Sequence, residues 1–311
     1  MKGRALVTGG AGFIGSHICD ALLADGWRVR ALDDLSVGRR ENVPAGCELI
    51  TGSVLDDAAL TAAFEGVDAV CHEAARVSIR GSVERFCEDA ETNLVGTLRT
   101  LRAASRAGVR RFVMASSMAV YADSPERIPV RESHPLDPTC PYGINKLAAE
   151  RQVMLLGGQL AMEPVALRYF NTFGPRQAFT PYVGVVTIFA TKLLAGETIT
   201  IFGNGSQTRD FVHVTDVARA NALALSSPAA PHRVFNVGSG RGTSVREIAA
   251  MLRARLRPDA AVRYEPARPE ELLHSVADIT AAQRALGYAP ETDLERQIDD
   301  VIDSLRKVRT A

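Results

Sequence analysis

The sequence predicts an α/β protein built around a doubly wound parallel sheet, and three observations support this fold class. Short runs of β-branched and other apolar residues alternate with amphipathic or alanine-rich stretches of helix length. Several of these runs are almost continuously apolar, which is typical of parallel strands covered by helices on both faces. A cluster of glycines follows the first run directly, where a strand must turn tightly into a helix.

Six strands are expected in the first half of the chain, each followed by a helical pattern. They are the runs RALVTG (4–9), RVRALDD (28–34), CELITGSV (47–54), DAVCHEAA (68–75), RFVMASS (111–117) and PVALRYFN (164–171). Because strands that alternate with helices form a parallel sheet, these runs predict one sheet with helical crossovers.

After Pro175 the alternation loosens into loops marked by glycine and proline, with a helix near 184–196 and a strand at TITIFG. The segments FVHVTDVARANALAL and RVFNVGSG then return to the earlier pattern. We therefore expect residues 1–172, with return segments at about 211–240, to form one domain. Residues 173–311 are expected to form mainly a smaller, discontinuous α/β lobe.

The composition excludes several classes of protein. With 311 residues, 46% of them hydrophobic, and a mean hydropathy of +0.01, the chain can bury a substantial core. Lys plus Arg and Asp plus Glu both number 36, so no net charge favours a nucleic acid or an acidic membrane as partner. The opening MKGRALVTGG is neither a signal peptide nor a membrane span, and we expect a cytoplasmic protein.

The cysteines and histidines predict neither a disulfide framework nor a metal site. The five cysteines form an odd set without a C-x-x-C pair, which is typical of reduced thiols. His72, His134 and His213 are scattered without the spacing of metal ligands. No bound metal is therefore expected.

The segment LVTGGAGFIGSH carries the glycines that a dinucleotide-binding turn requires. Gly9, Gly12 and Gly15 form G-x-x-G-x-x-G between the first strand and the first helix. Glycine lets the turn tighten, lets the backbone approach a pyrophosphate and lets the helix pack against the strand. The helix N-terminus then directs its free amides and its positive dipole toward the phosphates.

Acidic residues at the end of the second strand indicate which dinucleotide is bound. Asp33 stands where a carboxylate accepts hydrogen bonds from the adenosine ribose, and the neighbouring Asp34 would repel a 2′-phosphate. NAD is therefore expected rather than NADP. A tight turn without any ligand is the alternative interpretation.

Four motifs together resemble one protein family. They are the glycine pattern, ASSMAVY (115–121), YGINK (142–146) and RYFNTFGPRQ (168–177). In this order they are similar to the extended short-chain dehydrogenase/reductase family, most closely to its nucleotide-sugar 4-epimerases, from Lys2 to about Asp278. The resemblance implies a Rossmann-type fold, NAD as cofactor, a UDP-hexose as substrate, and a homodimer that pairs through 84–108 and 142–157.

The same resemblance implies a catalytic group of three residues. Inversion at C4 needs a base whose pKa lies near the working pH, and a free tyrosine titrates at about 10. Tyr142 is the expected base, and Lys146, one helical turn further on, is expected to lower its pKa and to hold the nicotinamide ribose. Ser117, at the end of the fifth strand, is expected to bond the same sugar oxygen and share its proton.

Met118 and Ala119 separate this reaction from its alternatives. Family members that dehydrate the sugar resemble an Asp-Glu pair at these positions, and decarboxylating members carry a Glu at the second. Methionine and alanine move no protons, so oxidation and re-reduction without elimination are expected. A dehydratase, a decarboxylase and a reductase are the alternatives, together with a non-catalytic NAD-binding protein from a different class.

The resemblance also implies a set of cofactor contacts. The expected residues are Gly9, Gly12, Phe13, Ile14, Gly15, Asp33, Asp34, Ser53, Val54, Ala74, Ala75, Asn93, Tyr142 and Lys146. Ser53 stands where the family usually has an aspartate on the adenine amino group, so NAD is expected to bind less tightly. Asn93 has a second interpretation, a hydrogen bond to the backbone inside its own helix.

On the substrate side the resemblance implies contacts with the diphosphate, the uridine and the sugar. The expected residues are Ser78, Ser117, Asn171, Val185, Arg209, Arg268, Glu271 and Ser275. Two arginines suit a diphosphate because guanidinium groups form paired, charge-assisted bonds to its oxygens. Ser78 has the alternative role of a local backbone cap.

Ser275 bears on the identity of the sugar. It falls where some family members carry a tyrosine beside the sugar, so space for an N-acetyl group at C2 is expected. UDP-glucose, UDP-galactose, their N-acetylated counterparts and UDP-glucuronate are all candidate substrates.

Overall fold

The computed structural model describes residues 2–123, 128–179, 184–267 and 273–310. Its largest layer is a seven-stranded sheet in the order β10-β6-β5-β4-β1-β2-β3, in which all neighbouring strands are parallel. The strands are β1 (Arg4–Thr8), β2 (Arg28–Asp33), β3 (Glu48–Thr51), β4 (Ala69–His72), β5 (Arg111–Ser117), β6 (Glu163–Tyr169) and β10 (Arg233–Val237). The predicted doubly wound parallel sheet is confirmed. Its strand order reverses between β1 and β4, where such sheets bind their ligands.

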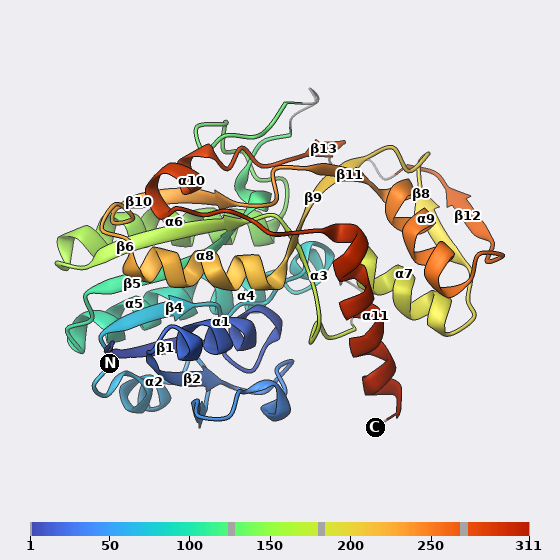
Figure 1. The fold of residues 1–311 in the computed structure, drawn as a ribbon. Helices are drawn as coiled ribbons and strands as arrows, with labels where there is room; N and C mark the ends of the chain where they lie inside the picture. Colours follow the sequence, from blue (N-terminus) through green and yellow to red (C-terminus); the bar gives the residue numbers. More distant parts are fainter. Residues whose placement is uncertain (1, 124–127, 180–183, 268–272, 311) are drawn as a thin grey trace.

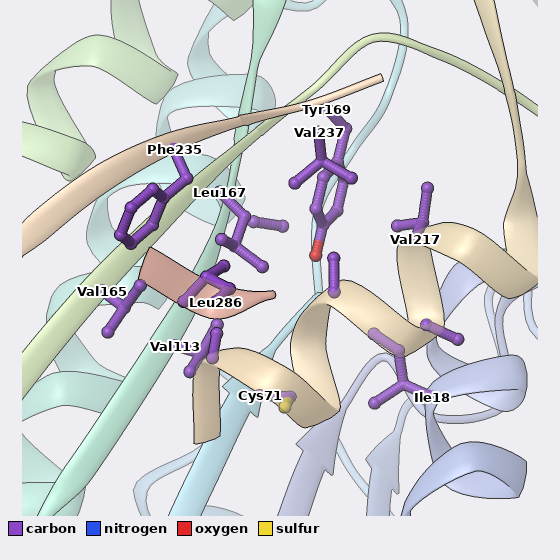
Figure 2. Packing of buried hydrophobic residues seen from close by; sticks show 14 of the residues in the cluster. Ile18, Cys71, Val113, Val165, Leu167, Tyr169, Val217, Phe235, Val237 and Leu286 are labelled. Atoms are coloured by element: carbon purple, nitrogen blue, oxygen red, sulfur yellow. The ribbon is translucent and has the colours of Figure 1, made fainter. Parts of the chain in front are cut away.

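Helices cover both faces of this sheet, as Figure 1 shows. One face carries α1 (Phe13–Ala24), α8 (Val214–Ser226) and α10 (Thr280–Leu286), and the other carries α2 (Asp57–Phe64), α5 (Thr97–Arg106) and α6 (Pro141–Gln159). Each face has its own hydrophobic cluster of fully buried side chains. Figure 2 shows the cluster under α8, where Phe235, Leu167 and Leu286 pack together.

Short helical segments follow the carboxyl ends of several strands. They are η1 (Arg40–Asn42), α3 (Ile79–Glu84), α4 (Phe86–Ala90), the π-helical η2 (Glu91–Gly96) and the 3-10 turn η3 (Met118–Val120). The segments α3, α4 and η2 come after β4, and η3 comes directly after β5. These segments therefore lie around the end of the sheet where a ligand is expected. Irregular helical turns are frequent at functional sites.

Local sequence signals explain where the regular elements begin. All four residues of β4 are buried, in agreement with their continuously apolar pattern. The carboxylate of Asp56 accepts hydrogen bonds from the first amides of α2. Ser244 and Glu247 form a reciprocal capping box at the start of α9 (Val245–Leu256).

A smaller α/β lobe lies beside the large sheet (Figure 1). Its remaining elements are α7 (Val185–Leu194), α11 (Leu294–Thr310), β7 (Asn171–Phe173), β8 (Ile199–Phe202), β9 (Thr208–His213), β11 (Gly242–Ser244), β12 (Val262–Glu265) and β13 (His274–Ser275). Strands β8 and β12 form a parallel pair, while β9 pairs with β7, β11 and β13. Phe189, Ile201 and Leu252 belong to the core of this lobe.

The chain crosses between the two parts more than once. Strand β9 is followed by α8 on the face of the large sheet, and β10 at the edge of that sheet precedes β11 in the smaller one. The smaller lobe is therefore discontinuous in sequence. The exact domain boundaries, placed at 172 and at about 211–240, stay a prediction.

A buried carboxylate links the chain segments that cross between the large sheet and the smaller lobe. Asp210 on β9 has no exposed surface, and it accepts hydrogen bonds from the backbone amides of Ser239 (2.7 Å), Gly240 (2.9 Å) and Ala277 (3.1 Å). The hydroxyl of Ser239 donates to the same carboxylate at 2.6 Å. One side chain thus satisfies backbone donors that follow β10 and β13.

We predict that Asp210→Ala lowers the free energy of unfolding by about 3 kcal/mol or more, because it leaves buried amides without acceptors. Asp56→Ala is the matched control, since it removes an exposed helix cap and costs about 1 kcal/mol. Urea unfolding followed by circular dichroism measures both changes. Equal losses in the two variants would contradict the role of Asp210.

Candidate active site

The glycine-rich turn between β1 and α1 has space only for glycine. Gly9 has a left-handed φ of 69°, and a Cβ there would lie 2.9 Å from the amide nitrogen of Ala74. A Cβ on Gly15 would lie 2.1 Å from the carbonyl oxygen of Gly9. Gly12, the N-cap of α1, has no side chain with which to cap the helix. The amides at this end of α1, including those of Phe13 and Ile14, therefore receive no hydrogen bond from a side chain at Gly12. A helix end of this kind suits the binding of a phosphate.

Asp33 at the end of β2 holds the glycine-rich turn in place. Its carboxylate accepts hydrogen bonds from the amides of Ala11 (2.9 Å) and Leu35 (2.8 Å). Burial raises the pKa of Asp33, and these backbone hydrogen bonds oppose the rise. Asp34 is exposed and binds the amide and hydroxyl of Ser36. The contacts of both residues with a ribose stay predictions.

The adenine end of the expected cofactor site lies after β3. Ser53 accepts a hydrogen bond from the amide of Leu55 at 3.2 Å, so its hydroxyl supports the local turn. Val54 is buried, and a Cβ on Gly96 would lie 2.9 Å from its side chain. The structure thus brings η2 against the segment that follows β3.

Asn93 positions the segment that follows β4. Its side-chain oxygen accepts from the amide of Arg76 and its side-chain nitrogen donates to the carbonyl of Arg76, both at 3.0 Å. The second interpretation, a bond inside its own helix, is therefore wrong for the side chain. Ala74, whose amide donates to the Thr8 hydroxyl at 3.2 Å, and Ala75 lie in the segment that these bonds hold.

The structure brings the three predicted catalytic residues together at the carboxyl end of β5. Tyr142 lies in the first turn of α6, and its phenol lies near the hydroxyl of Ser117, the last residue of β5, which acts to lower its pKa. Lys146, one turn further along α6, donates from Nζ to the carbonyl oxygen of Ala115 at 2.9 Å. Both Tyr142 and Lys146 are buried.

Burial has the largest effect on the pKa values of Tyr142 and Lys146. It raises the pKa of Tyr142 to about 12, and the nearby hydroxyl of Ser117 opposes the rise. Burial also lowers the pKa of Lys146 to about 8. We expected Lys146 to lower the pKa of Tyr142; in the structure the lysine does not offset the effect of burial. Its Nζ donates to the Ala115 carbonyl. The chain by itself therefore keeps Tyr142 protonated at neutral pH.

The first turn of α6 is fixed from two sides. The amide of Tyr142 donates to the Ser82 hydroxyl at 3.1 Å, and Asn145 donates to the buried carboxylate of Asp89 at 2.8 Å. A Cβ on Gly143 would lie 2.3 Å from the carbonyl oxygen of Ala119. The glycine in YGINK therefore lets α6 approach η3 closely and brings Tyr142 to Ser117.

A buried ionic network, which the sequence analysis missed, lies directly beneath the catalytic group. Arg168 on β6 and Glu150 on α6 form an ion pair at 2.5 Å, with side-chain exposures of 3% and 2%. The hydroxyl of Ser116 donates to Glu150 at 2.6 Å, and Arg168 donates to the phenol of Tyr121 at 2.9 Å. A signal was present in the sequence, since a glutamate one turn after Lys146 and an arginine inside an apolar strand are unusual there.

Four of the predicted substrate residues lie on the smaller lobe and its junction. Asn171 begins β7, Val185 begins α7, and Arg209 on β9 lies in register with Ser275 on β13. Arg209 donates to the carbonyl of Thr208 at 2.9 Å. Buried polar atoms of Asn171 (Oδ1) and Ser275 (Oγ) have no partner within the described residues. Such orphaned atoms mark a place where a ligand can complete the hydrogen bonding.

Ser78, Arg268 and Glu271 are the remaining residues that were predicted to contact the substrate. Ser78 caps α3, since its hydroxyl accepts from the amide of Gly81 at 2.8 Å; its contact with a sugar stays a prediction. Arg268 and Glu271 lie outside the described residues.

The described residues contain no group of three or more His, Cys, Asp or Glu that could hold a metal ion. Among the helices of the same ranges, none has the length and apolar character needed to cross a membrane.

Comparison with known proteins shows which class of enzyme has this fold and site. The model of the NAD dependent epimerase/dehydratase family matches residues 5–238, more than half of the chain. The protein therefore belongs to this family, and the glycine-rich turn with its uncapped helix fits the NAD that the family uses.

Individual relatives are similar over nearly the whole chain. UDP-glucose 4-epimerase from Mycolicibacterium smegmatis is 38% identical over 310 residues, covering 97% of this chain and 98% of that protein. UDP-glucose 4-epimerase from Thermotoga maritima, solved with UDP-glucose, has a TM-score of 0.93 and 35% identity over 98% of this chain and 99% of its own. The Thermus thermophilus UDP-glucose 4-epimerase, in complex with NAD, has a TM-score of 0.89 and 38% identity over 97% and 99%.

We predict that Glu150→Gln lowers the free energy of unfolding by about 3–5 kcal/mol, because it leaves the Arg168 charge buried and unpaired. Asp57→Asn is the control, since it breaks an exposed pair with Arg102 and should change stability far less. Chemical denaturation measures both variants. A loss in Glu150→Gln no larger than in the control would contradict the importance of the buried pair.

Proposed function

We propose that this protein catalyses NAD-dependent epimerisation at C4 of a UDP-hexose. The observation that carries the proposal is the placement of Ser117, Tyr142 and Lys146 together at the carboxyl end of β5, where Lys146 binds the Ala115 carbonyl. A paired hydroxyl and phenol at this edge of a dinucleotide-binding sheet suit proton exchange with a sugar hydroxyl. The similarity to UDP-glucose 4-epimerases supports the same reaction.

The residues of the chain then have distinct roles. The turn formed by Gly9, Gly12 and Gly15 receives the cofactor pyrophosphate, and Asp33 receives the adenosine ribose. NAD, when bound, supplies a hydride acceptor and a positive charge beside Tyr142. Tyr142 takes the proton of the 4-hydroxyl, helped by the Ser117 hydroxyl, and returns it after the keto sugar has turned in the pocket.

The segment η3 argues against the alternative reactions. Met118 and Ala119 follow Ser117 directly and carry no group that moves a proton. Dehydration or decarboxylation would need an acid or base at this place, so a product of unchanged mass is proposed. A binding protein without catalysis is disfavoured by the Ser117–Tyr142 contact, for which such a protein has no use.

The domain division and the homodimer belong to the same proposal. Large apolar side chains on α3, α4, η2 and α6 are exposed, namely Val83, Phe86, Val95, Ile144 and Leu155. An exposed apolar surface of this kind is typical of a protein interface, and its helices fall within 84–108 and 142–157 or beside them. A homodimer through these helices, two domains that divide near 172, and a cytoplasmic location stay predictions.

We predict that Tyr142→Phe lowers kcat about 10²- to 10⁴-fold while NAD stays bound, because only the proton-transfer group is lost. Proton NMR and mass spectrometry of UDP-glucose, UDP-galactose, their N-acetylated counterparts and UDP-glucuronate measure turnover and product mass. Tyr264→Phe, on an exposed tyrosine, is the matched control and should keep full activity. Normal turnover in Tyr142→Phe would contradict the assignment, and a product lighter by water or carbon dioxide would contradict epimerisation.

We predict that Ser275→Tyr lowers the turnover of UDP-N-acetylhexosamines relative to UDP-glucose about 10- to 200-fold, because the larger ring fills the space beside the sugar. Ser275→Ala keeps that space and should leave the ratio unchanged. The ratio of kcat/KM for the two substrates measures the effect. If Ser275→Tyr left the ratio at its original value, Ser275 would not be beside the C2 substituent.

A further inference from the structure

A carboxylate with no role in the reaction described above lies near the catalytic group. Glu73 directly follows β4, and its amide donates to the carbonyl of Thr8 at 3.1 Å. The phenol of Tyr169, the last residue of β6, donates to its Oε1 at 3.0 Å. Asn221 on α8 in turn donates to the Tyr169 hydroxyl at 2.7 Å. Glu73 is thus held at the carboxyl ends of β4 and β6, close to the end of β5.

The lysine of the catalytic group needs negative charge around it. Lys146 is only 2% exposed, and the hydrogen bond of its Nζ is to a neutral carbonyl, that of Ala115. Burial lowers its pKa to about 8, and the carboxylates of Glu73 and Asp89 oppose this change, Glu73 more strongly. An amine that is buried without such charges loses its proton.

The other titratable groups around Glu73 come from several elements. Tyr142 and Lys146 face it from α6, Tyr169 from β6, and Cys71 from β4. Lys146 also faces His72 of β4 and Asp89 of α4. Burial keeps His72 neutral, with a pKa lowered to about 3. Lys146 is therefore the basic group on which the charge of Glu73 acts.

The effect of Glu73 on the tyrosine is the weaker one. Burial, Ser117, Asp89 and Cys140 all influence the pKa of Tyr142 more than Glu73 does. Burial raises the pKa of Glu73 itself to about 7, while the hydrogen bond from Tyr169 and the charge of Lys146 oppose the rise. Glu73 is thus ionised over the alkaline range in which Lys146 would lose its proton.

We propose that Glu73 is a positioning residue that acts through Lys146, keeping the buried lysine in its ammonium form next to Tyr142. The inference rests on the proposed function, because the ammonium matters there for stabilising the phenolate form of Tyr142, which takes the proton of the 4-hydroxyl. It adds to that function a carboxylate, held at the ends of β4 and β6, whose charge acts on Lys146.

The protonation of Lys146 can be measured without substrate or cofactor. The chain has few lysines, namely Lys2, Lys146, Lys192 and Lys307, so NMR of protein labelled with ¹³C at lysine Cε resolves each one. Glu73→Gln keeps the shape and the acceptor for Tyr169 but removes the charge, and should lower the pKa of Lys146 by about one unit. Glu73→Asp keeps a charge at a greater distance and should lower it less.

Glu163→Gln is the control, because Glu163 stands at the amino-terminal end of β6, far from the catalytic end. It should leave the pKa of Lys146 unchanged. Should Glu73→Gln fail to fold, Glu73→Met removes the charge at similar volume and is measured in its place. An unchanged Lys146 pKa in the folded charge-removing variant would overturn the proposal.

The pH profile of the epimerase reaction provides the second measurement. Because loss of Glu73 lowers the pKa of Lys146, the ammonium is lost at lower pH, and the alkaline limb of kcat should move about one unit toward acid. A merely structural role would lower kcat at every pH without moving this limb, which would overturn the proposal. If the Lys146 pKa falls as expected but the wild type converts no UDP-hexose, the proposed function is overturned while the effect of Glu73 on Lys146 stands.

Discussion

The catalytic end of this structure depends on the buried ion pair between Glu150 and Arg168. The pair joins α6 to β6, and the hydroxyl of Ser116 ties it to β5 one residue before Ser117, which is proposed to be catalytic. Tyr121, which receives a hydrogen bond from Arg168, donates to Asn236 on β10 at 2.6 Å. Because buried charges tolerate few alternative arrangements, this network sets how α6 lies against the ends of three strands.

The same burial that fixes the geometry works against the charged forms of the catalytic side chains. The pKa of Tyr142 is raised to about 12 and that of Lys146 is lowered to about 8, both mainly by burial. The ligand-free chain therefore holds a tyrosine and not a tyrosinate. Formation of the base depends on charge, and the carboxylates of Glu73 and Asp89 oppose the lowering of the Lys146 pKa by burial.

Much of this could be predicted from single residues in their local context. The strands of the large sheet and the glycine-rich turn follow from runs and spacings a few residues long, and the resemblance of short motifs to one family implies the group Ser117, Tyr142 and Lys146. The bonds of Asn93 to the Arg76 backbone and the hydrogen bond from Tyr169 to Glu73 could not, because each depends on a partner that another element supplies.

The sequence by itself determined the fold class and the dinucleotide-binding turn, because hydrophobic periodicity and glycine sterics are local properties. The proton-transferring side chains are proposed from the resemblance of its motifs to one family. Only the tertiary structure decided how these side chains titrate and what holds them. Glu150 and Arg168 are 18 residues apart, and Tyr169 lies 96 residues from Glu73. Desolvation and ionic pairing between residues so far apart in sequence arise only when the chain has folded. Short sequence patterns therefore do not predict them.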